Sequence, residues 1–266
     1  MKLEYNKDLR NQKEKVVTED GSTTLLSKEF NESYHSTFDG ALKETMQKHI
    51  LPAFSFQKEK EHLTILDICF GLGYNTLATI YHIKKNNLKT KVHILSPEFD
   101  KELIQSLSTF EYPKEFDTLR DIITTLSREF YYEDEQFKIE ILLGDARDSI
   151  PQIKEKIDIV YQDAFSPKKN PLLWTKEYFS DIKAISKKDT IITTYSVASA
   201  VRMSLYENGF NIFLVKNRAV RPFTIASLSM LDGVEYIDME LKKSRNPDAR
   251  SLRDSEFSTS CTSPHT

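Results

Sequence analysis

The segment at residues 65–76 constrains the fold of this chain more than any other. It joins a short apolar run to a glycine turn and then to a helical pattern, which is the opening of a nucleotide-type binding unit. Gly71 and Gly73 permit the positive φ and the close backbone approach that a ligand at the carboxyl end of a strand requires. Thr76 stands where the dinucleotide fingerprint has its third glycine. The segment therefore disfavours a pyrophosphate bound at the helix N-terminus.

Asp67, near the end of the apolar run, also disfavours a phosphate ligand. A carboxylate repels an anion, whereas it suits a ligand that carries a positive centre or an ammonium group. S-adenosylmethionine carries both, so we expect it as the cofactor. A glycine turn with a purely structural role is the alternative interpretation of this segment.

The composition excludes several classes of protein. No segment approaches the roughly 20 apolar residues that cross a bilayer. Residues 1–15 lack the apolar stretch of a secretory signal, and two cysteines cannot form a disulfide framework. We therefore expect a cytoplasmic protein that makes no membrane contact. The formal net charge of −3 does not indicate nucleic-acid binding, so any such binding must use a local basic patch.

Apolar runs that alternate with helical patterns predict an α/β fold with a mostly parallel sheet. Two further apolar runs, at residues 210–215 and 223–230, predict an antiparallel hairpin that closes the sheet. A seven-stranded sheet of this kind is typical of class I (Rossmann-like) S-adenosylmethionine-dependent methyltransferases rather than of dehydrogenases. The five parallel strands are expected at residues 63–68, 91–95, 138–143, 157–162 and 190–194. The helices are expected at residues 34–50, ended by Pro52, and at 75–84, 147–153, 171–186 and 197–208.

We expect one main domain with short additions at both ends. Residues 1–52 are predicted to form an arm and a helix that pack on the catalytic domain. Residues 53–240 are predicted to form the methyltransferase domain, with a helical insertion at about residues 99–135. Residues 241–266 form a polar tail that we expect to be partly disordered, above all from Ser255 onward.

Acidic residues follow four of the expected strands, and in an open parallel sheet the ligand lies across these carboxyl ends. Glu98 lies 25 positions after Gly73, close to the spacing of about 20 at which an acidic residue binds a ribose diol. A solvated loop glutamate is the alternative. Asp145 can accept a hydrogen bond from an adenine amino group beside Ala146, or it can only cap the next helix. The four acidic residues are Asp67, Glu98, Asp145 and Asp163.

Asp163 begins the most unusual segment of the chain, residues 163–174, in which Pro167 and Pro171 stiffen the loop. A rigid loop that places a carboxylate beside a sulfonium suits methyl transfer to an amine. The carboxylate can hold the ammonium group or take its proton. No His or Cys cluster has the spacing of metal ligands, and we expect no metal. Trp174 is assigned to core packing.

The segment at residues 163–175 resembles a segment of the methyltransferase domain of MnmC, a family of bifunctional proteins that modify the wobble uridine of tRNA. It reads DAFSPKKNPLLWT, where the family has DGFAPxKNPxMWT. The resemblance implies transfer of a methyl group from S-adenosylmethionine to the exocyclic amine of 5-aminomethyl-2-thiouridine in the anticodon loop. The product is the 5-methylaminomethyl derivative. Further family signatures are similar, in the same order, to residues 19–25, 34–44, 70–75 and 96–98, so the similarity spans roughly residues 18–210.

The predicted site residues fall into three groups. Asp163 is the expected catalytic residue, because the resemblance implies that it faces the methyl group and the amine. The expected cofactor-binding residues are Tyr34, Asp67, Gly71, Gly73, Asn75, Glu98, Asp145, Ala146 and Asp163. The expected substrate-binding residues are His35, Phe165, Pro167, Lys168 and Lys169, with a buried structural histidine as the alternative for His35.

Two features depart from the family. Too little chain follows Thr224 for the FAD-dependent oxidase domain, so we expect no FAD and a substrate that already carries its aminomethyl group. Residues 217–222 read NRAVRP, where the family has residues similar to GRKREM. Binding of tRNA phosphates needs basic residues near the site, and the alternative for each lysine pair is a solvated surface. The candidates are Lys168, Lys169, Lys187, Lys188, Arg218, Arg221, Lys242 and Lys243.

Two other classes of function stay open on this sequence. An aminopropyltransferase or a small-molecule N-methyltransferase can share the sheet, its acidic strand ends and an amine acceptor. A non-catalytic module that binds S-adenosylmethionine or tRNA is the second. Turnover of free polyamine identifies the first class, and cofactor binding without turnover identifies the second.

Overall fold

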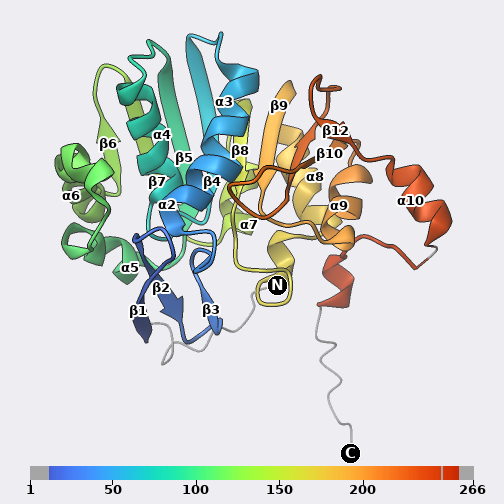
Figure 1. Cartoon of the computed structure of the whole chain (residues 1–266), viewed down its shortest axis with the longest axis horizontal. Coiled ribbons are helices and arrows are strands. Elements are labelled where there is room, and N and C mark those ends of the chain that lie inside the picture. The colour runs from blue at the N-terminus through green and yellow to red at the C-terminus, as the bar shows by residue number, and fades with distance from the viewer. Residues whose placement is uncertain (1–11, 247, 258–266) are drawn as a thin grey trace, which may run out of the picture.

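The computed structural model describes residues 12–246 and 248–257 of the chain (Figure 1). A large mixed sheet runs through its centre with helices on both faces, and a small sheet from the N-terminal segment lies below it in the view. Within the described ranges, no helix combines the length and the apolar character needed to cross a membrane.

The large sheet is parallel at its centre and antiparallel at both edges. Its parallel strands are β4 (His62–Ile68), β5 (Lys91–Glu98), β7 (Phe137–Leu143), β8 (Ile157–Gln162) and β9 (Ser186–Thr194). Its antiparallel strands are β6 (Tyr131–Glu133), β10 (Asn211–Val215), β11 (Phe223–Ser227) and β12 (Glu235–Tyr236). These nine strands of the described chain follow the order β12-β10-β11-β9-β8-β4-β5-β7-β6.

The sheet confirms the predicted α/β fold, with its five parallel strands and the hairpin β10–β11 that closes them. The sequence does not predict β6 and β12, because strands of two or three residues are too short to show alternation. The strand order reverses at β4, which pairs with β5 on one side and with β8 on the other. Ligands of open α/β sheets bind at such a switch point.

Helices cover both faces of this sheet and enclose two apolar cores. Alternate residues of the central strands enter different cores, since successive side chains of a strand point to opposite faces. Ile65 packs in one core and Leu66 in the other, and both are fully buried, which stabilises the fold by about 1.5–3 kcal/mol each. The first core includes α3 (Leu51–Gln57), α4 (Tyr74–Lys85) and α6 (Arg120–Glu129). The second includes α7 (Ala146–Ser149), η4 (Ile150–Gln152), η5 (Pro171–Leu173), α8 (Lys176–Ile185) and α9 (Ser199–Tyr206).

The N-terminal segment forms a small antiparallel sheet and then a continuous helical stretch. The strands are β1 (Lys13–Val17), β2 (Thr23–Ser27) and β3 (Glu32–Ser33), and the stretch is α2 (Ala41–Glu44), the π-helix η1 (Thr45–Ile50) and α3. The predicted helix at 34–50 is therefore wrong at both ends: it begins at Ala41 and continues past Pro52 to Gln57. Pro52 lies in the first turn of α3, where its fixed φ and missing N–H are tolerated.

The predicted helical insertion at residues 99–135 contains α5 (Lys101–Ser106), η2 (Leu107–Thr109), η3 (Lys114–Leu119) and α6. It lies at the far left of Figure 1. Its side chains Phe116 and Ile122 are buried in the same core as α4. The insertion is therefore an integral part of the packed domain.

The C-terminal part of the described chain contains α10 (Met239–Arg245) and η6 (Asp254–Glu256). Residues 251–257 pack back onto the domain, because the Lys176 N–H donates to the Leu252 carbonyl at 2.8 Å and Asp254 pairs with Arg147. The prediction of disorder from Ser255 is thus wrong for residues 255–257. Residues 258–266 lie outside the described residues.

Asp67, the penultimate residue of β4, is fully buried, and its side chain faces α4. Its Oδ2 accepts a hydrogen bond from the Thr76 hydroxyl at 2.9 Å, and its Oδ1 accepts one from the Asn75 amide at 3.2 Å. Burial disfavours the charged form and raises the pKa of Asp67 to about 7, against the lowering effect of these two donors.

The raised pKa of Asp67 predicts a pH-dependent contribution to stability. An unfolded chain has an aspartate pKa near 3.9, so the folded state binds the proton more tightly and its free energy of unfolding falls between about pH 4 and 7. Asp67→Asn removes this contribution. Relative to wild type, the variant should gain on the order of 4 kcal/mol at most between pH 4 and 8 in urea unfolding. A stability difference that does not change with pH would contradict this assignment.

Candidate active site

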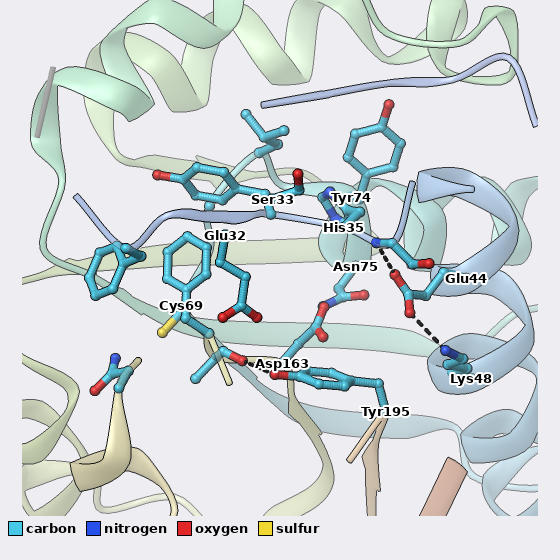
Figure 2. A pocket seen from close by; sticks show the side chains of 18 of the residues that line it. Glu32, Ser33, His35, Glu44, Lys48, Cys69, Tyr74, Asn75, Asp163 and Tyr195 are labelled. Atoms are coloured by element: carbon cyan, nitrogen blue, oxygen red, sulfur yellow. Dashed lines mark hydrogen bonds and ion pairs between the residues drawn. The ribbon is translucent and has the colours of Figure 1, made fainter. Parts of the chain in front are cut away.

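Two adjacent cavities lie at the carboxyl ends of β4, β5 and β8. The larger has a volume of about 610 Å³ and the smaller about 180 Å³. Their linings share Cys69, Glu98, Phe99 and Asn170. Figure 2 shows Asp163 and Asn75 near the middle of the larger cavity, with Cys69 and Glu32 on one side and Glu44 and Lys48 on the other. The site is therefore at the switch point of the sheet, as the strand order predicts.

The glycine turn after β4 is held by a carboxylate from the neighbouring strand. Glu98 Oε2 accepts a hydrogen bond from the Gly71 N–H at 2.8 Å, and Oε1 accepts one from the Asp100 N–H at 2.8 Å. Gly71 has a φ of 55°, and a Cβ there would lie 3.2 Å from the Tyr34 ring. Gly73 has a φ of 72°, and a Cβ there would lie 2.8 Å from the Phe70 ring. Both positions therefore need glycine for conformation and for space.

Cys69 and Glu98 line both cavities, and burial raises the pKa of both side chains. Burial raises the pKa of Glu98, while the backbone N–H groups of Asp100 and Gly71 oppose the rise. Burial also raises the pKa of the Cys69 thiol, and the negative charges of Glu98 and Asp163 raise it further. Cys69 is therefore a neutral, partly buried thiol and not a nucleophile.

The smaller cavity is lined by the turn that joins β7 to α7. Asp145 and Ala146 both line it, beside Gly144. Asp145 also caps α7, because its side chain accepts a hydrogen bond from the Arg147 N–H at 2.9 Å. The capping role that the sequence allows is thus present, and the same residue borders the cavity.

Asp163, directly after β8, has a polar neighbour at each of its carboxylate oxygens. Oδ2 accepts a hydrogen bond from the Asn75 amide at 3.0 Å, and Oδ1 lies 3.4 Å from His49 Nε2. Burial would raise the pKa of Asp163, but His49, His35 and the Asn75 amide outweigh it and hold this pKa below its usual value. The side chain is 13% exposed, and Asp163 lines the larger cavity. It is a fixed negative charge at the centre of the site.

The loop after Asp163 is held on three sides. Glu32 accepts hydrogen bonds from the N–H and the hydroxyl of Ser166, at 3.1 and 2.6 Å. Trp174 Nε1 donates to the Phe165 carbonyl at 2.8 Å, and the Tyr195 hydroxyl donates to the Ala164 carbonyl at 2.9 Å. Trp174 is fully buried, as the sequence predicts.

An aromatic wall faces the larger cavity. The Phe165 ring stacks on Phe30 with a centroid distance of 4.3 Å, and Tyr34 packs edge-on against Phe165 at 4.9 Å. His35 lies on the same side of the molecule, packed on Tyr74 at 4.6 Å, with its Nδ1 3.1 Å from the Thr24 hydroxyl. Burial lowers the pKa of His35, so this ring is neutral at pH 7.

A buried group of charges, which the sequence analysis missed, forms another side of the larger cavity. Lys48 is 2% exposed, and its Nζ lies 2.7 Å from Asp39 Oδ2 and 2.8 Å from Glu44 Oε1. Arg221 Nε lies 3.0 Å from the same Asp39 oxygen, and Arg221 Nη2 donates to the Ser36 hydroxyl at 2.8 Å. These residues come from the turn before α2, from α2 and η1, and from the connection between β10 and β11, so no single motif links all of them. The family signature at residues 34–44 contains Ser36 and Glu44 but does not indicate that they belong to a charged group.

The structure brings most of the predicted site residues together. Tyr34, His35, Gly71, Asn75, Glu98, Asp163 and Phe165 line the larger cavity, and Glu98, Asp145 and Ala146 line the smaller one. Five other predicted residues are absent from both linings. Asp67 is buried under the glycine turn, Gly73 begins α4, Pro167 is half-buried, and Lys168 and Lys169 are exposed.

Comparisons with known proteins agree with this geometry. Residues 114–227 match the profile of a family described as S-adenosyl-L-methionine-dependent methyltransferase. An uncharacterized protein of Methanocaldococcus jannaschii is 31% identical over 214 residues, which are 77% of this chain and 56% of that protein. The tRNA 5-methylaminomethyl-2-thiouridine biosynthesis bifunctional protein MnmC of Leptospira interrogans is 29% identical over 211 residues, 74% of this chain and 32% of that protein.

The chain thus spans about half and about a third of the length of these two relatives. The crystal structure of MnmC2 from Aquifex aeolicus is similar with a TM-score of 0.81 and 33% sequence identity. That match covers 96% of this chain and 83% of the Aquifex chain. The chain therefore belongs to the MnmC2 family of S-adenosyl-L-methionine-dependent methyltransferases.

Proposed function

We propose that this chain methylates the exocyclic amine of 5-aminomethyl-2-thiouridine at the wobble position in the anticodon loop of tRNA. The donor is S-adenosyl-L-methionine, the product is the 5-methylaminomethyl derivative, and neither a metal nor FAD takes part. The observation that carries the proposal is Asp163, an anchored carboxylate with a lowered pKa in the wall of the larger cavity. The name of the Leptospira interrogans relative supplies the tRNA nucleoside.

The residues of the two cavities fit S-adenosyl-L-methionine. Each oxygen of Glu98 accepts one backbone N–H and keeps a lone pair for a ribose hydroxyl. Asp145 and Ala146 border the smaller cavity, where they would hold the adenine, and the larger cavity, which Gly71 and Glu98 line, has room for the rest of the molecule. The carboxylates of Glu98 and Asp163 favour its positive charges. When bound, this cofactor supplies a methyl group that is already activated for transfer.

Asp163 has two roles toward the amine in this proposal. An ammonium group has no lone pair, so the amine must be neutral to attack. Asp163 accepts a hydrogen bond from the amine N–H and so directs the lone pair, and it then stabilises the positive charge on the product nitrogen. Its fixed position, between Asn75 and His49, keeps this geometry without rearrangement. The aromatic wall of Phe165, Phe30 and Tyr34 offers a surface for the pyrimidine ring.

The mouth of the larger cavity suits a nucleic acid. Phe38 is 70% exposed and lines the cavity, as do Val197 and the half-exposed Arg221. Exposed aromatic rings stack on bases, and an arginine beside them can pair with a phosphate. We therefore assign Phe38 to a nucleotide next to the modified one, and Arg221 to the backbone of the RNA.

The function is tested on tRNA that carries 5-aminomethyl-2-thiouridine. Incubation with wild-type protein and S-adenosyl-L-methionine should give 5-methylaminomethyl-2-thiouridine in mass analysis of the wobble nucleosides. The control is the same tRNA without the aminomethyl group, which should give no product. Turnover of free polyamine with none on tRNA would replace this function by that of a small-molecule enzyme. Cofactor binding with no turnover would replace it by that of a binding module.

Replacement of Asp163 should separate catalysis from cofactor binding. In Asp163→Asn, the amide keeps the size of the side chain but loses the negative charge. We expect kcat for tRNA methylation to fall by about 10²–10⁴-fold, while the Kd for S-adenosyl-L-methionine changes by no more than about threefold. Single-turnover kinetics and calorimetry measure the two quantities. Equal losses in both would move Asp163 from catalysis to cofactor binding.

Phe38 should contribute to tRNA affinity and to nothing else. Stacking of one base is worth about 1–3 kcal/mol, so Phe38→Ala should raise KM for tRNA by about 5-fold to 150-fold, and Phe38→Trp should restore it. The matched control is Met230→Ala, because Met230 is 61% exposed and lines neither cavity.

The salt dependence of tRNA affinity separates the contribution of Phe38 stacking from that of charged residues. Affinity for tRNA should weaken steeply with salt in wild type, and with the same slope in Phe38→Ala, since Phe38 neutralises no phosphate. An unchanged KM in Phe38→Ala, or a changed salt slope, would remove Phe38 from the interface.

A further inference from the structure

The π-helix η1 places two consecutive polar side chains in the interior of the protein. Lys48 is 2% exposed and His49 is fully buried. π-helical turns are rare, and they occur frequently at functional sites. Here the two side chains serve different neighbours, because Lys48 pairs with Asp39 and Glu44, whereas His49 contacts β9 and the end of β8. The role of Lys48 is charge pairing, but the role of His49 needs another explanation.

The ring of His49 is fixed by three contacts. Its Nδ1 lies 2.8 Å from the Thr193 hydroxyl of β9, and its Nε2 lies 3.4 Å from Asp163 Oδ1. The ring packs edge-on against Tyr161 of β8, with a centroid distance of 5.9 Å and an interplanar angle of 76°. Among the described residues, Nε2 has no partner at hydrogen-bond distance. A buried N–H without a partner costs about 1–3 kcal/mol, so a short approach of Asp163 to Nε2 is favourable.

The groups that face the two nitrogens of the His49 ring indicate which nitrogen carries the proton. Asp163 can only accept, since its pKa lies below the usual value. A proton on Nε2 therefore points at an acceptor, and Nδ1 then accepts from the Thr193 hydroxyl, which can donate. The opposite tautomer would direct the lone pair of Nε2 at a carboxylate. The other titratable groups around the ring are Asp67 from β4, His35 from the loop at 34–40, and Tyr161.

We propose that His49 is a positioning residue for the methyl transfer: its Nε2–H donates to Asp163 Oδ1, while Thr193 fixes the tautomer from the other side of the ring. With Asn75 on Oδ2, both oxygens of Asp163 are then held, and the lone pairs that remain are directed into the cavity. This inference rests on the proposed function of Asp163. It adds that the charge state and the direction of Asp163 depend on one buried histidine.

The inference predicts a change in the pH profile that a purely structural histidine would not cause. Burial acts to raise the pKa of Asp163, and His49 is the first of the groups that oppose it. Without His49 this pKa rises, so the acidic limb of the kcat profile moves to higher pH. For His49→Phe we expect a shift of about one pH unit or more and a loss of about tenfold or more in kcat at pH 7. The Kd for S-adenosyl-L-methionine should stay within about twofold.

Two further variants and a control make the test specific. His49→Gln keeps an N–H donor on the side chain, so it should recover part of kcat and move the acidic limb back toward wild type. Thr193→Val removes the hydroxyl but keeps the shape, and it should give an intermediate loss. The control is His62→Gln, because His62 is exposed at the start of β4, and kcat should not change. If His49→Phe fails to fold by circular dichroism, Thr193→Val and His49→Gln carry the test.

A measurement that needs no activity separates this inference from the proposed function. Long-range ¹H–¹⁵N spectra of the histidine-labelled protein should show the His49 ring, identified by its loss in His49→Gln, with the proton on Nε2. A proton on Nδ1, or a wild-type pH profile in His49→Phe, would overturn the positioning role. Wild-type protein that binds S-adenosyl-L-methionine but methylates no tRNA would overturn the proposed function, while the spectrum still decides the state of His49.

Discussion

Carboxylates buried at the carboxyl edge of a parallel sheet need hydrogen-bond donors, and this constraint organises the site. Burial alone raises the pKa of each of the three acids that meet there. Asp67 has two neutral side-chain donors, and its pKa is still raised to about 7. Glu98 has two backbone N–H groups, and its pKa is raised. At Asp163, His49, His35 and the Asn75 amide outweigh burial, and its pKa is lowered. The donors around each acid therefore decide in which direction its pKa moves.

The N-terminal segment supplies much of what makes the site specific. Class I sheets provide the glycine turn and the acidic strand ends, which any S-adenosyl-L-methionine-dependent enzyme of this fold can share. Phe30 and Glu32, from β3 and the turn before it, hold the loop after Asp163, and Tyr34 completes the aromatic wall. The helical stretch that follows adds His49 behind Asp163. The features that the proposed function assigns to the acceptor thus come from outside the conventional sheet.

Sequence reasoning predicts those parts of the site that follow from sheet geometry. Glu98 ends its strand, and Asp145 and Asp163 lie within two residues after theirs. The carboxyl ends of parallel strands meet at one edge, so the proximity of these residues can be deduced. Asp67 also lies at the carboxyl end of its strand, but its side chain points into the core. It is two residues from Ile65 on β4, so both side chains lie on the same face of the sheet. His49 is not predictable, since a π-helix has no sequence signature and its partner Thr193 lies 144 positions away. Pro52 misleads because the helical stretch does not end there: η1 runs directly into α3, whose first turn tolerates a proline.

The electrostatic field in the larger cavity depends on which of the surrounding acidic residues are paired with a cation. Asp39 and Glu44 are compensated by Lys48 and Arg221, and Asp100 is compensated by Lys13, at N–O distances of 2.7–3.0 Å. Ion pairs of this kind contribute little field at a distance, because their charges cancel. Asp163 differs from these acids, since no lysine or arginine of the described residues pairs with it, and the groups that lower its pKa are His49, His35 and the Asn75 amide. Its negative charge is thus left for a ligand, and a site built in this way favours a cation beside Asp163 over a neutral or anionic group.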